Sequence, residues 1–252
     1  MSILSLQNIT QAFGGIIALN DVSFQVAEGE ILGLIGPNGS GKSTAINVIT
    51  GFYTPQKGQV RFQGKDITGG KPHRIARLGL TRTFQLTQLL AKATVLDNVL
   101  TGMYMHCGEN LWDAVSRSQE GNPKERKLRE RAREIMEFIG IAADAGKPCM
   151  AASHFTRKRL GLAMAFATQP KMMLIDELVS GLSGEEARGM MKVVRDIRAT
   201  GITVLMVEHN MRVIMSLCER IVVLKYGAKI AEGTPDQVAA NKEVQEAYLG
   251  AK

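Results

Sequence analysis

Cysteine is scarce in this 252-residue chain, which contains only Cys107, Cys149 and Cys218. An odd, widely spaced set of three matches no metal, redox or disulfide pattern, so we expect the reduced thiols of a cytosolic protein. Uninterrupted apolar runs of about 18 residues are also lacking, and we therefore expect no membrane-spanning helix. The amino terminus has no basic stretch followed by a long apolar run, which argues against a signal peptide.

Charge is plentiful but unbalanced, with 31 Lys and Arg against 24 Asp and Glu, a net charge of +7 and a pI near 9.4. This balance permits an anionic partner, whether a phosphate ligand, a nucleic acid or an anionic membrane surface, and does not choose among them. An apolar fraction of 45% and a charged fraction of 22% exclude a disordered chain. The length is sufficient to bury a substantial core.

Strand and helix patterns alternate along most of the chain. Residues 3–27 alternate in polarity, with turn signals at Gly14-Gly15 and Asn20-Asp21, which predicts short antiparallel strands. Further along, the patterns predict buried strands at 31–36, 171–177 and 201–209, a helix at 184–200, a hairpin at 220–235 and a closing helix. Strands that alternate with helices indicate an α/β fold with a mostly parallel sheet.

Residues 103–145 differ from the rest because they carry no strand signal. Apolar side chains recur there at helical spacing, namely Leu128, Ala132, Ile135, Met136 and Ile139. We interpret this region as a helical insertion. Its many charges fit a solvated helix face better than a nucleic-acid tract.

A glycine-rich motif follows the predicted strand 31–36 and precedes a predicted helix. It reads Gly36, Pro37, Asn38, Gly39, Ser40, Gly41, Lys42, Ser43 and Thr44, with the spacing G-x-x-x-x-G-K-S. Such a loop surrounds phosphate oxygens with backbone N–H groups, its lysine reaches the β- and γ-phosphates, and its serine ligates Mg²⁺. A chance glycine turn is the alternative, and the flanking strand and helix disfavour it.

Two carboxylates, Asp176 and Glu177, end the predicted strand 171–177. In a phosphate-loop protein, a carboxylate at this position holds Mg²⁺ directly or through water, and the next one can polarise an attacking water. Alone, the pair could be a surface turn; together with the phosphate loop, a catalytic role is favoured.

With these motifs in order, the chain resembles the ATP-binding subunit of an ABC transporter over nearly its whole length. The resemblance implies that Phe13 stacks on adenine, that Gln85 in "RTFQ" approaches Mg²⁺ and senses the membrane subunits, and that His209 contacts the γ-phosphate. Residues 180–183, "SGLS", correspond to the D-loop, where the usual aspartate is Ser183. Each matching residue alone could have a purely structural role, but five motif elements in the order of the family are not a coincidence.

The resemblance also implies a fold. We expect one ABC-type P-loop NTPase domain over 1–252, in which 1–102 and 170–252 form the core with an antiparallel β subdomain and about 103–169 form a helical subdomain. The resemblance is narrower in some segments, which are similar to the larger of the two different ATPase subunits of branched-chain amino acid importers. These segments are 34–44, 49–85, 94–103, 218–235 and 247–250. Relatives with similar segments also import amides, urea or aromatic acids. The resemblance therefore specifies the ATPase activity more closely than the transported solute.

The family's signature, LSGGQ, corresponds to 152–156, where only Ser153 is retained. In ABC dimers this motif faces ATP bound on the other subunit. His154 and Phe155 place side chains where glycines let the backbone approach phosphate, so the contact should weaken. We hypothesise a heterodimer with one competent and one impaired ATP site. Leu178, where proline is usual, should have a small effect.

Two other functions stay open at this point: a regulatory subunit that binds ATP without turnover, and a soluble ABC ATPase that acts on nucleic acid or ribosomes. The resemblance favours ATP and Mg²⁺ as ligands. Its implied partners are membrane subunits, a second, different ATPase subunit and, indirectly, an extracytoplasmic solute-binding protein, with no nucleic acid. The implied location is peripheral, at the cytoplasmic face of the inner membrane.

Overall fold

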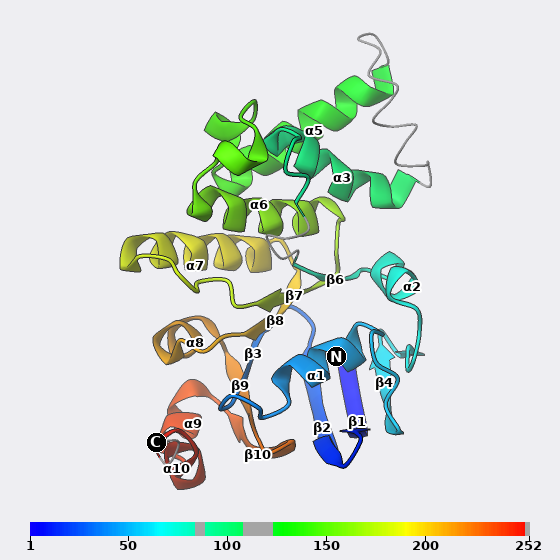
Figure 1. Ribbon diagram of the computed structural model, residues 1–252, viewed down its shortest axis with the longest axis vertical. Helices are drawn as coiled ribbons and strands as arrows, with labels where there is room; N and C mark the ends of the chain where they lie inside the picture. Colours follow the sequence, from blue (N-terminus) through cyan, green and yellow to red (C-terminus); the bar gives the residue numbers. More distant parts are fainter. Residues whose placement is uncertain (84–88, 108–122, 250–252) are drawn as a thin grey trace.

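The computed structural model describes residues 1–83, 89–107 and 123–249, although not the side chains of 105–107 and 249 (Figure 1). Two sheets organise this part of the chain. A four-stranded antiparallel sheet has the order β2-β1-β4-β5, and a six-stranded sheet has the order β10-β9-β3-β8-β7-β6. All neighbours in the second sheet are parallel except β10 and β9, which confirms the predicted α/β fold with a mostly parallel sheet and an antiparallel part.

The strands of the antiparallel sheet are β1 (Ser2–Phe13), β2 (Ile16–Ala27), β4 (Lys57–Phe62) and β5 (Lys65–Asp66). Those of the six-stranded sheet are β3 (Ile31–Ile35), β6 (Leu80–Arg82), β7 (Met172–Asp176), β8 (Thr203–Val207), β9 (Arg220–Lys225) and β10 (Ala228–Gly233). The helices are α1 (Lys42–Ile49), α2 (Pro72–Arg77), α3 (Val95–Cys107), α5 (Pro123–Ile139), α6 (His154–Ala167), α7 (Gly184–Ala199), α8 (Met211–Leu217), α9 (Pro235–Ala240) and α10 (Lys242–Leu249).

One of the two predicted turns near the amino terminus is wrong. Gly14 and Gly15 form the turn between β1 and β2, as expected. Asp21, however, lies inside β2, where it adopts a φ of 54° and accepts a 2.8 Å hydrogen bond from Asn8 Nδ2 on β1. Asn8 also has a positive φ, of 51°. These two short polar residues tolerate a left-handed backbone, so the chain makes a β-bulge here instead of a turn.

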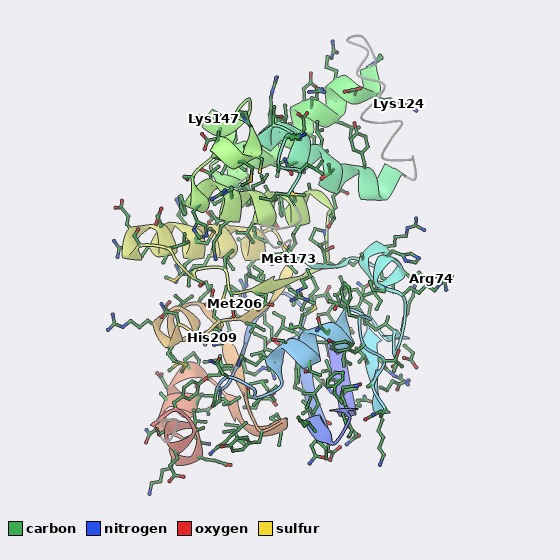
Figure 2. All side chains as sticks on the ribbon, viewed as in Figure 1. Arg74, Lys124, Lys147, Met173, Met206 and His209 are labelled. Carbon is green, nitrogen blue, oxygen red and sulfur yellow. The ribbon has the colours of Figure 1, made fainter. Side chains whose placement is uncertain are left out.

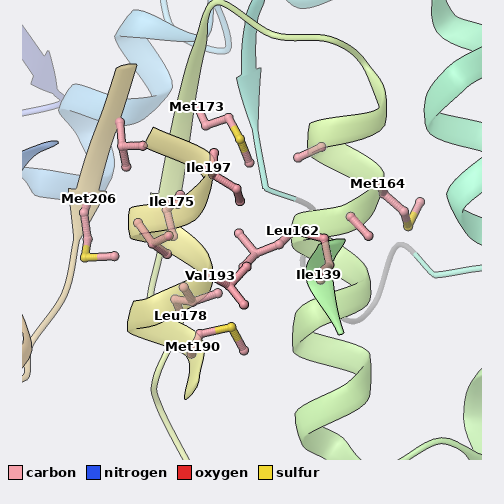
Figure 3. Packing of buried hydrophobic residues seen from close by; sticks show 14 of the residues in the cluster. Ile139, Leu162, Met164, Met173, Ile175, Leu178, Met190, Val193, Ile197 and Met206 are labelled. Atoms are coloured by element: carbon pink, nitrogen blue, oxygen red, sulfur yellow. The ribbon is translucent and has the colours of Figure 1, made fainter. Parts of the chain in front are cut away.

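The core lies on both faces of the six-stranded sheet. All five residues of β3 are buried, and its four apolar side chains divide by strand alternation between two hydrophobic clusters. Ile31 and Ile35 join the cluster on the side of α6 and α7, whereas Leu32 and Leu34 join the cluster beneath the antiparallel sheet and α1. Figure 3 shows the first cluster, which fills the space between β7, α7 and α6. Helices and the second sheet therefore cover the two faces of the parallel sheet.

The helical region at one end of the molecule is built from α3, α5 and α6 (Figure 1). Its first helix begins at Val95, before the expected 103. On α5 the predicted apolar stripe is buried, except that Leu128 at its start is only partly buried. Two short 3-10 turns, Ala142–Asp144 and Cys149–Ala151, connect α5 to α6.

No helix in the described ranges combines the length and the apolar character that crossing a membrane requires.

Candidate active site

Residues from several elements line one cavity of ≈ 420 Å³ at the carboxyl ends of the parallel strands. Ligands bind to open α/β sheets at this edge. The lining contains Ile16, Ile17, Ala18, Asn38, Gly39, Ser40, Gly41, Lys42, Ser43, Thr44, Asp176, Glu177, Val207 and His209. The sequence motifs thus converge on a single cavity, although they lie far apart in the chain.

The glycine-rich loop has a backbone that requires glycine. Gly41 adopts a φ of 103°, and a Cβ there would lie 2.5 Å from the carbonyl oxygen of Ala18. A Cβ on Gly36 would lie 2.1 Å from the carbonyl oxygen of Leu224. Gly41 caps α1 without a side-chain hydrogen bond, and the first turn contains no acid. The N–H groups that begin α1 therefore face the cavity as an anion-binding helix terminus.

Lys42 is buried and folds back over the loop. Its Nζ donates to the carbonyl oxygens of Gly36 (2.7 Å) and Pro37 (2.9 Å) and to Ser40 Oγ (3.3 Å). Burial lowers the pKa of Lys42, and the nearby negative charges of Asp176 and Glu177 partly oppose this. The ammonium group is thus held at the loop, next to the space that a phosphate would occupy.

Asp176 and Ser43 supply the oxygens that Mg²⁺ prefers. Asp176 is the last residue of β7, and Ser43 lies in the first turn of α1, both on the cavity wall. Ser43 is exposed, and its hydroxyl has no hydrogen bond to any residue that the structure describes. This donor set fits a hydrated Mg²⁺, which keeps several waters and takes one or two protein ligands together with phosphate oxygens.

Glu177 and His209 meet across the cavity. His209 Nε2 lies 2.8 Å from Glu177 Oε1, and each side chain is about half exposed, at 47% and 53%. Figure 2 shows His209 between the end of β8 and α8. Glu177 adopts a φ of 49°, an unfavourable conformation for glutamate, and its N–H donates to the carbonyl oxygen of Val207. Strain of this kind gathers at functional sites.

Two further side chains hold the backbone next to Glu177. Lys158 on α6 donates from Nζ to the Glu177 carbonyl oxygen at 2.8 Å, and burial lowers the pKa of Lys158. The buried Glu208 accepts the N–H of Val179 at 2.7 Å, and burial raises the pKa of Glu208. Neither residue was predicted from the sequence.

The signature segment begins α6. Ser153 is the N-cap: its hydroxyl accepts the N–H of Thr156 at 3.0 Å, and Thr156 in turn donates to Asp144. His154 is exposed and close to Gly181. Phe155 instead packs inward against α7, where Arg159 lies 4.3 Å above its ring. The expected obstruction therefore falls on His154, because Phe155 turns toward the core.

The basic run 157–159 on α6 is not a free cationic patch. Arg159 lies over Phe155 and donates to the Gly140 carbonyl oxygen, while Lys158 is bonded to Glu177. All three side chains are partly buried. Cations engaged in this way are poorly placed to contact a nucleic-acid backbone.

Not every predicted site residue lies at the cavity. Phe13 ends β1, is 44% exposed and packs edge-on against Tyr53 with ring centroids 5.1 Å apart. Ile16 and Ile17 line the cavity there instead, and these exposed apolar residues were missed. Gly36, Pro37 and Ser153 do not line it, and Gln85 lies outside the described residues. The roles of Phe13 and Gln85, and the contact of His209 with the γ-phosphate, stay predictions.

Ser183 stands where the resemblance expects aspartate. Its hydroxyl accepts the N–H of Glu186, and the Glu186 carboxylate accepts the N–H of Ser183 at 2.8 Å. This capping box starts α7. Leu178, in place of the usual proline, is buried in the core beside α7 (Figure 3). Both departures thus have local structural roles.

Comparison with known proteins agrees with this geometry. The profile described as "ABC transporter" matches residues 19–180, which is more than half of the chain. The chain belongs to the ABC transporter family. A second profile, described as "Branched-chain amino acid ATP-binding cassette transporter", matches residues 228–252. As an ABC cassette, the chain is an ATP-hydrolysing enzyme, and the predicted P-loop NTPase fold is confirmed.

Relatives of this ABC cassette match over its full length. It is 34% identical over 249 residues to the high-affinity branched-chain amino acid transport ATP-binding protein BraF of Pseudomonas aeruginosa, covering 98% of each chain. It is 37% identical over 252 residues to a probable branched-chain amino acid transport ATP-binding protein LivG of Archaeoglobus fulgidus, covering 100% of this chain and 97% of the relative. A crystal structure of an ABC transporter cassette in its ADP conformation superimposes with a TM-score of 0.88 at 36% identity, covering 99% of each chain.

Proposed function

We propose that this cassette hydrolyses ATP in the cavity between its phosphate loop and the Glu177–His209 pair, and thereby powers an importer of branched-chain amino acids or related small polar solutes. The observation that carries the proposal is the hydrogen bond between His209 and Glu177 beside Lys42 and Asp176. The matches to two branched-chain amino acid transport proteins support the solute class.

The side chains divide the work as follows. The loop N–H groups and Lys42 bind the phosphates, and Ser43 and Asp176, which line the same cavity, would hold Mg²⁺. When bound, Mg²⁺ neutralises charge that develops on the phosphate oxygens. An ionised carboxylate only accepts hydrogen bonds, so His209 Nε2 donates to Glu177 and orients it. The free lone pairs of Glu177 then polarise the water that attacks the γ-phosphorus, while ADP leaves.

The partners follow from the same proposal. The cassette docks at the cytoplasmic face of the inner membrane on two membrane subunits, and an extracytoplasmic binding protein delivers the solute to them. A second, different ATPase subunit completes the pair, because the signature segment of this chain retains only Ser153 and His154 obstructs it. The site of this chain turns over ATP when the partner supplies an intact signature.

Purification from native membranes tests this assembly. The tagged full chain, solubilised in mild detergent, should recover two membrane proteins and a second ATPase of different sequence, identified by mass spectrometry. Reconstituted with its binding protein, the complex should take up labelled leucine, or else an amide, urea or an aromatic acid, only with ATP. Recovery with ribosomes or nucleic acid would overturn the proposed importer function. Recovery of two copies of this chain and no second ATPase would overturn the proposed heterodimer.

A further inference from the structure

The geometry points to Arg82 as a positioning residue for Asp176, and through it for Mg²⁺ binding. Arg82 ends the edge strand β6, next to β7, which ends at Asp176. Arg82 Nη2 lies 2.8 Å from Asp176 Oδ2, and Nη1 donates to Asn47 Oδ1 at 3.1 Å. The guanidinium group therefore bridges the Asp176 carboxylate to α1, the helix that follows the phosphate loop.

Burial strengthens the attraction between Arg82 and Asp176. The Arg82 and Asp176 side chains are only 25% and 17% exposed, so solvent screens their attraction poorly. Hydrogen bonds between ionised partners are stronger than neutral ones and more directional. With Arg82 anchored at both ends, the Asp176 carboxylate has one preferred orientation.

That orientation suits metal binding. A carboxylate has about four lone-pair sites, and Arg82 occupies a site on Oδ2. Among the described residues no donor is bonded to Oδ1, so its lone pairs are available on a residue that lines the cavity with Ser43. Hydrogen-bonded partners of a metal ligand fix its direction in this way, and their loss weakens metal binding. Arg82 thus acts through Asp176 and touches neither nucleotide nor metal itself.

A competing role would have the opposite consequence. If Arg82 mainly occupied the place of the cation, its removal would free Asp176 and strengthen Mg²⁺ binding. The bond to Asn47 argues against competition, because Asn47 lies one turn of α1 beyond Ser43 and anchors the guanidinium group there, not at Ser43 itself. The inference rests on the proposed role of Asp176 as a Mg²⁺ ligand.

The test is nucleotide binding with and without metal. Affinity for a fluorescent ATP analogue is measured on the full chain in excess MgCl₂ and in EDTA, and the ratio of the two dissociation constants gives the enhancement by Mg²⁺. In Arg82→Gln we expect the affinity in EDTA to stay within about twofold and the enhancement to fall by about tenfold or more. Arg82→Lys, which keeps the charge but lacks the rigid planar fork of the guanidinium group, should recover part of the enhancement.

Two controls complete the design. Arg77→Gln removes an exposed arginine from α2, for which the described chain shows no ion pair, and should change neither constant. Asn47→Ala removes only the anchor of Arg82 and should reduce the enhancement by a smaller factor than Arg82→Gln. If Arg82→Gln fails to fold, as judged by thermal unfolding, the Asn47→Ala result decides, and an unchanged enhancement there overturns the inference.

The outcomes separate this inference from the proposed function. If the native chain shows no enhancement by Mg²⁺, the proposed metal site fails, and the role of Arg82 fails with it. If the native chain shows the enhancement and Arg82→Gln keeps or exceeds it, only the positioning role fails. In an Asp176→Asn background, Arg82→Gln should have no further effect on the enhancement, since the two residues act as a unit.

Discussion

His209 Nε2 lies 2.8 Å from Glu177 Oε1, although 32 positions separate the two residues in the chain. The neighbouring parallel strands β7 and β8 bring them together, because Asp176 at the end of β7 pairs with Val207 at the end of β8. Glu177 is the first residue after β7, and His209 is the second residue after β8. The register between β7 and β8 therefore brings the two side chains together.

Replacing Ser153 tests what its hydroxyl does in this chain. It caps α6 by accepting the N–H of Thr156, so Ser153→Ala should lower the free energy of unfolding by about 1 kcal/mol. Ser153→Thr keeps a capping oxygen and should lose much less. Urea denaturation of the three proteins measures both changes. Equal stability of native chain and alanine variant would contradict the capping role.

Two glycines of the phosphate loop should respond differently to alanine. Gly39 and Gly41 both have positive φ, so either substitution costs about 1–3 kcal/mol in backbone strain. A methyl group on Gly39 meets no atom within 4 Å, whereas on Gly41 it lies 2.5 Å from the Ala18 carbonyl oxygen. Gly41→Ala should therefore have the lower free energy of unfolding of the two variants, by about 1–3 kcal/mol more, as measured in urea. Equal losses would show that the loop relaxes around the added carbon.

Glu208 gives the stability a defined pH dependence. Burial raises the pKa of Glu208 above its ordinary value, so the folded chain binds this proton more tightly than the unfolded chain. The contribution of Glu208 to stability is complete below the ordinary pKa of glutamate, about 4.3, and is lost as pH rises through the folded value. Glu208→Gln keeps an oxygen for the N–H of Val179 and carries no charge.

We therefore expect Glu208→Gln to gain stability relative to the native chain as pH rises from 4 to about 7. Thermal unfolding across this range measures the difference in the midpoint between the two proteins. The exposed Glu137 on α5 provides the control, and Glu137→Gln should show a difference that is nearly flat with pH. A Glu208→Gln difference that shrinks as pH rises would reverse the sign of this argument.

Local patterns predicted most of the fold. The buried strands β3, β7 and β8 were predicted because each is a short apolar run bounded by turn signals or charge. The short strand β6 was missed because three residues carry no periodicity, and its place depends on pairing with β7. The bulge at Asp21 looked like a turn, since the same residue types favour both.

Site residues that belong to a sequence motif could be predicted, whereas residues that act only through contacts in the folded chain could not. The phosphate loop, Asp176 and His209 have fixed spacings or neighbours in sequence, and the structure brings them to one cavity. Arg82, Lys158 and Glu208 act through contacts with residues far away in the chain, so only the folded arrangement identifies them. The inward turn of Phe155 likewise depends on its packing against α7.

The most direct test of the central claim is ATP turnover with the signature restored and Glu177 varied. Residues 152–156 are changed to Leu-Ser-Gly-Gly-Gln, with and without Glu177→Gln, and phosphate release is measured beside the native chain after thermal unfolding confirms that each is folded. We expect little turnover by the native chain and a clear gain on restoration. Adding Glu177→Gln should cut this turnover by about 100-fold or more while ATP binding persists. Native turnover equal to that of the restored chain, or restored turnover that Glu177→Gln leaves unchanged, would contradict this mechanism.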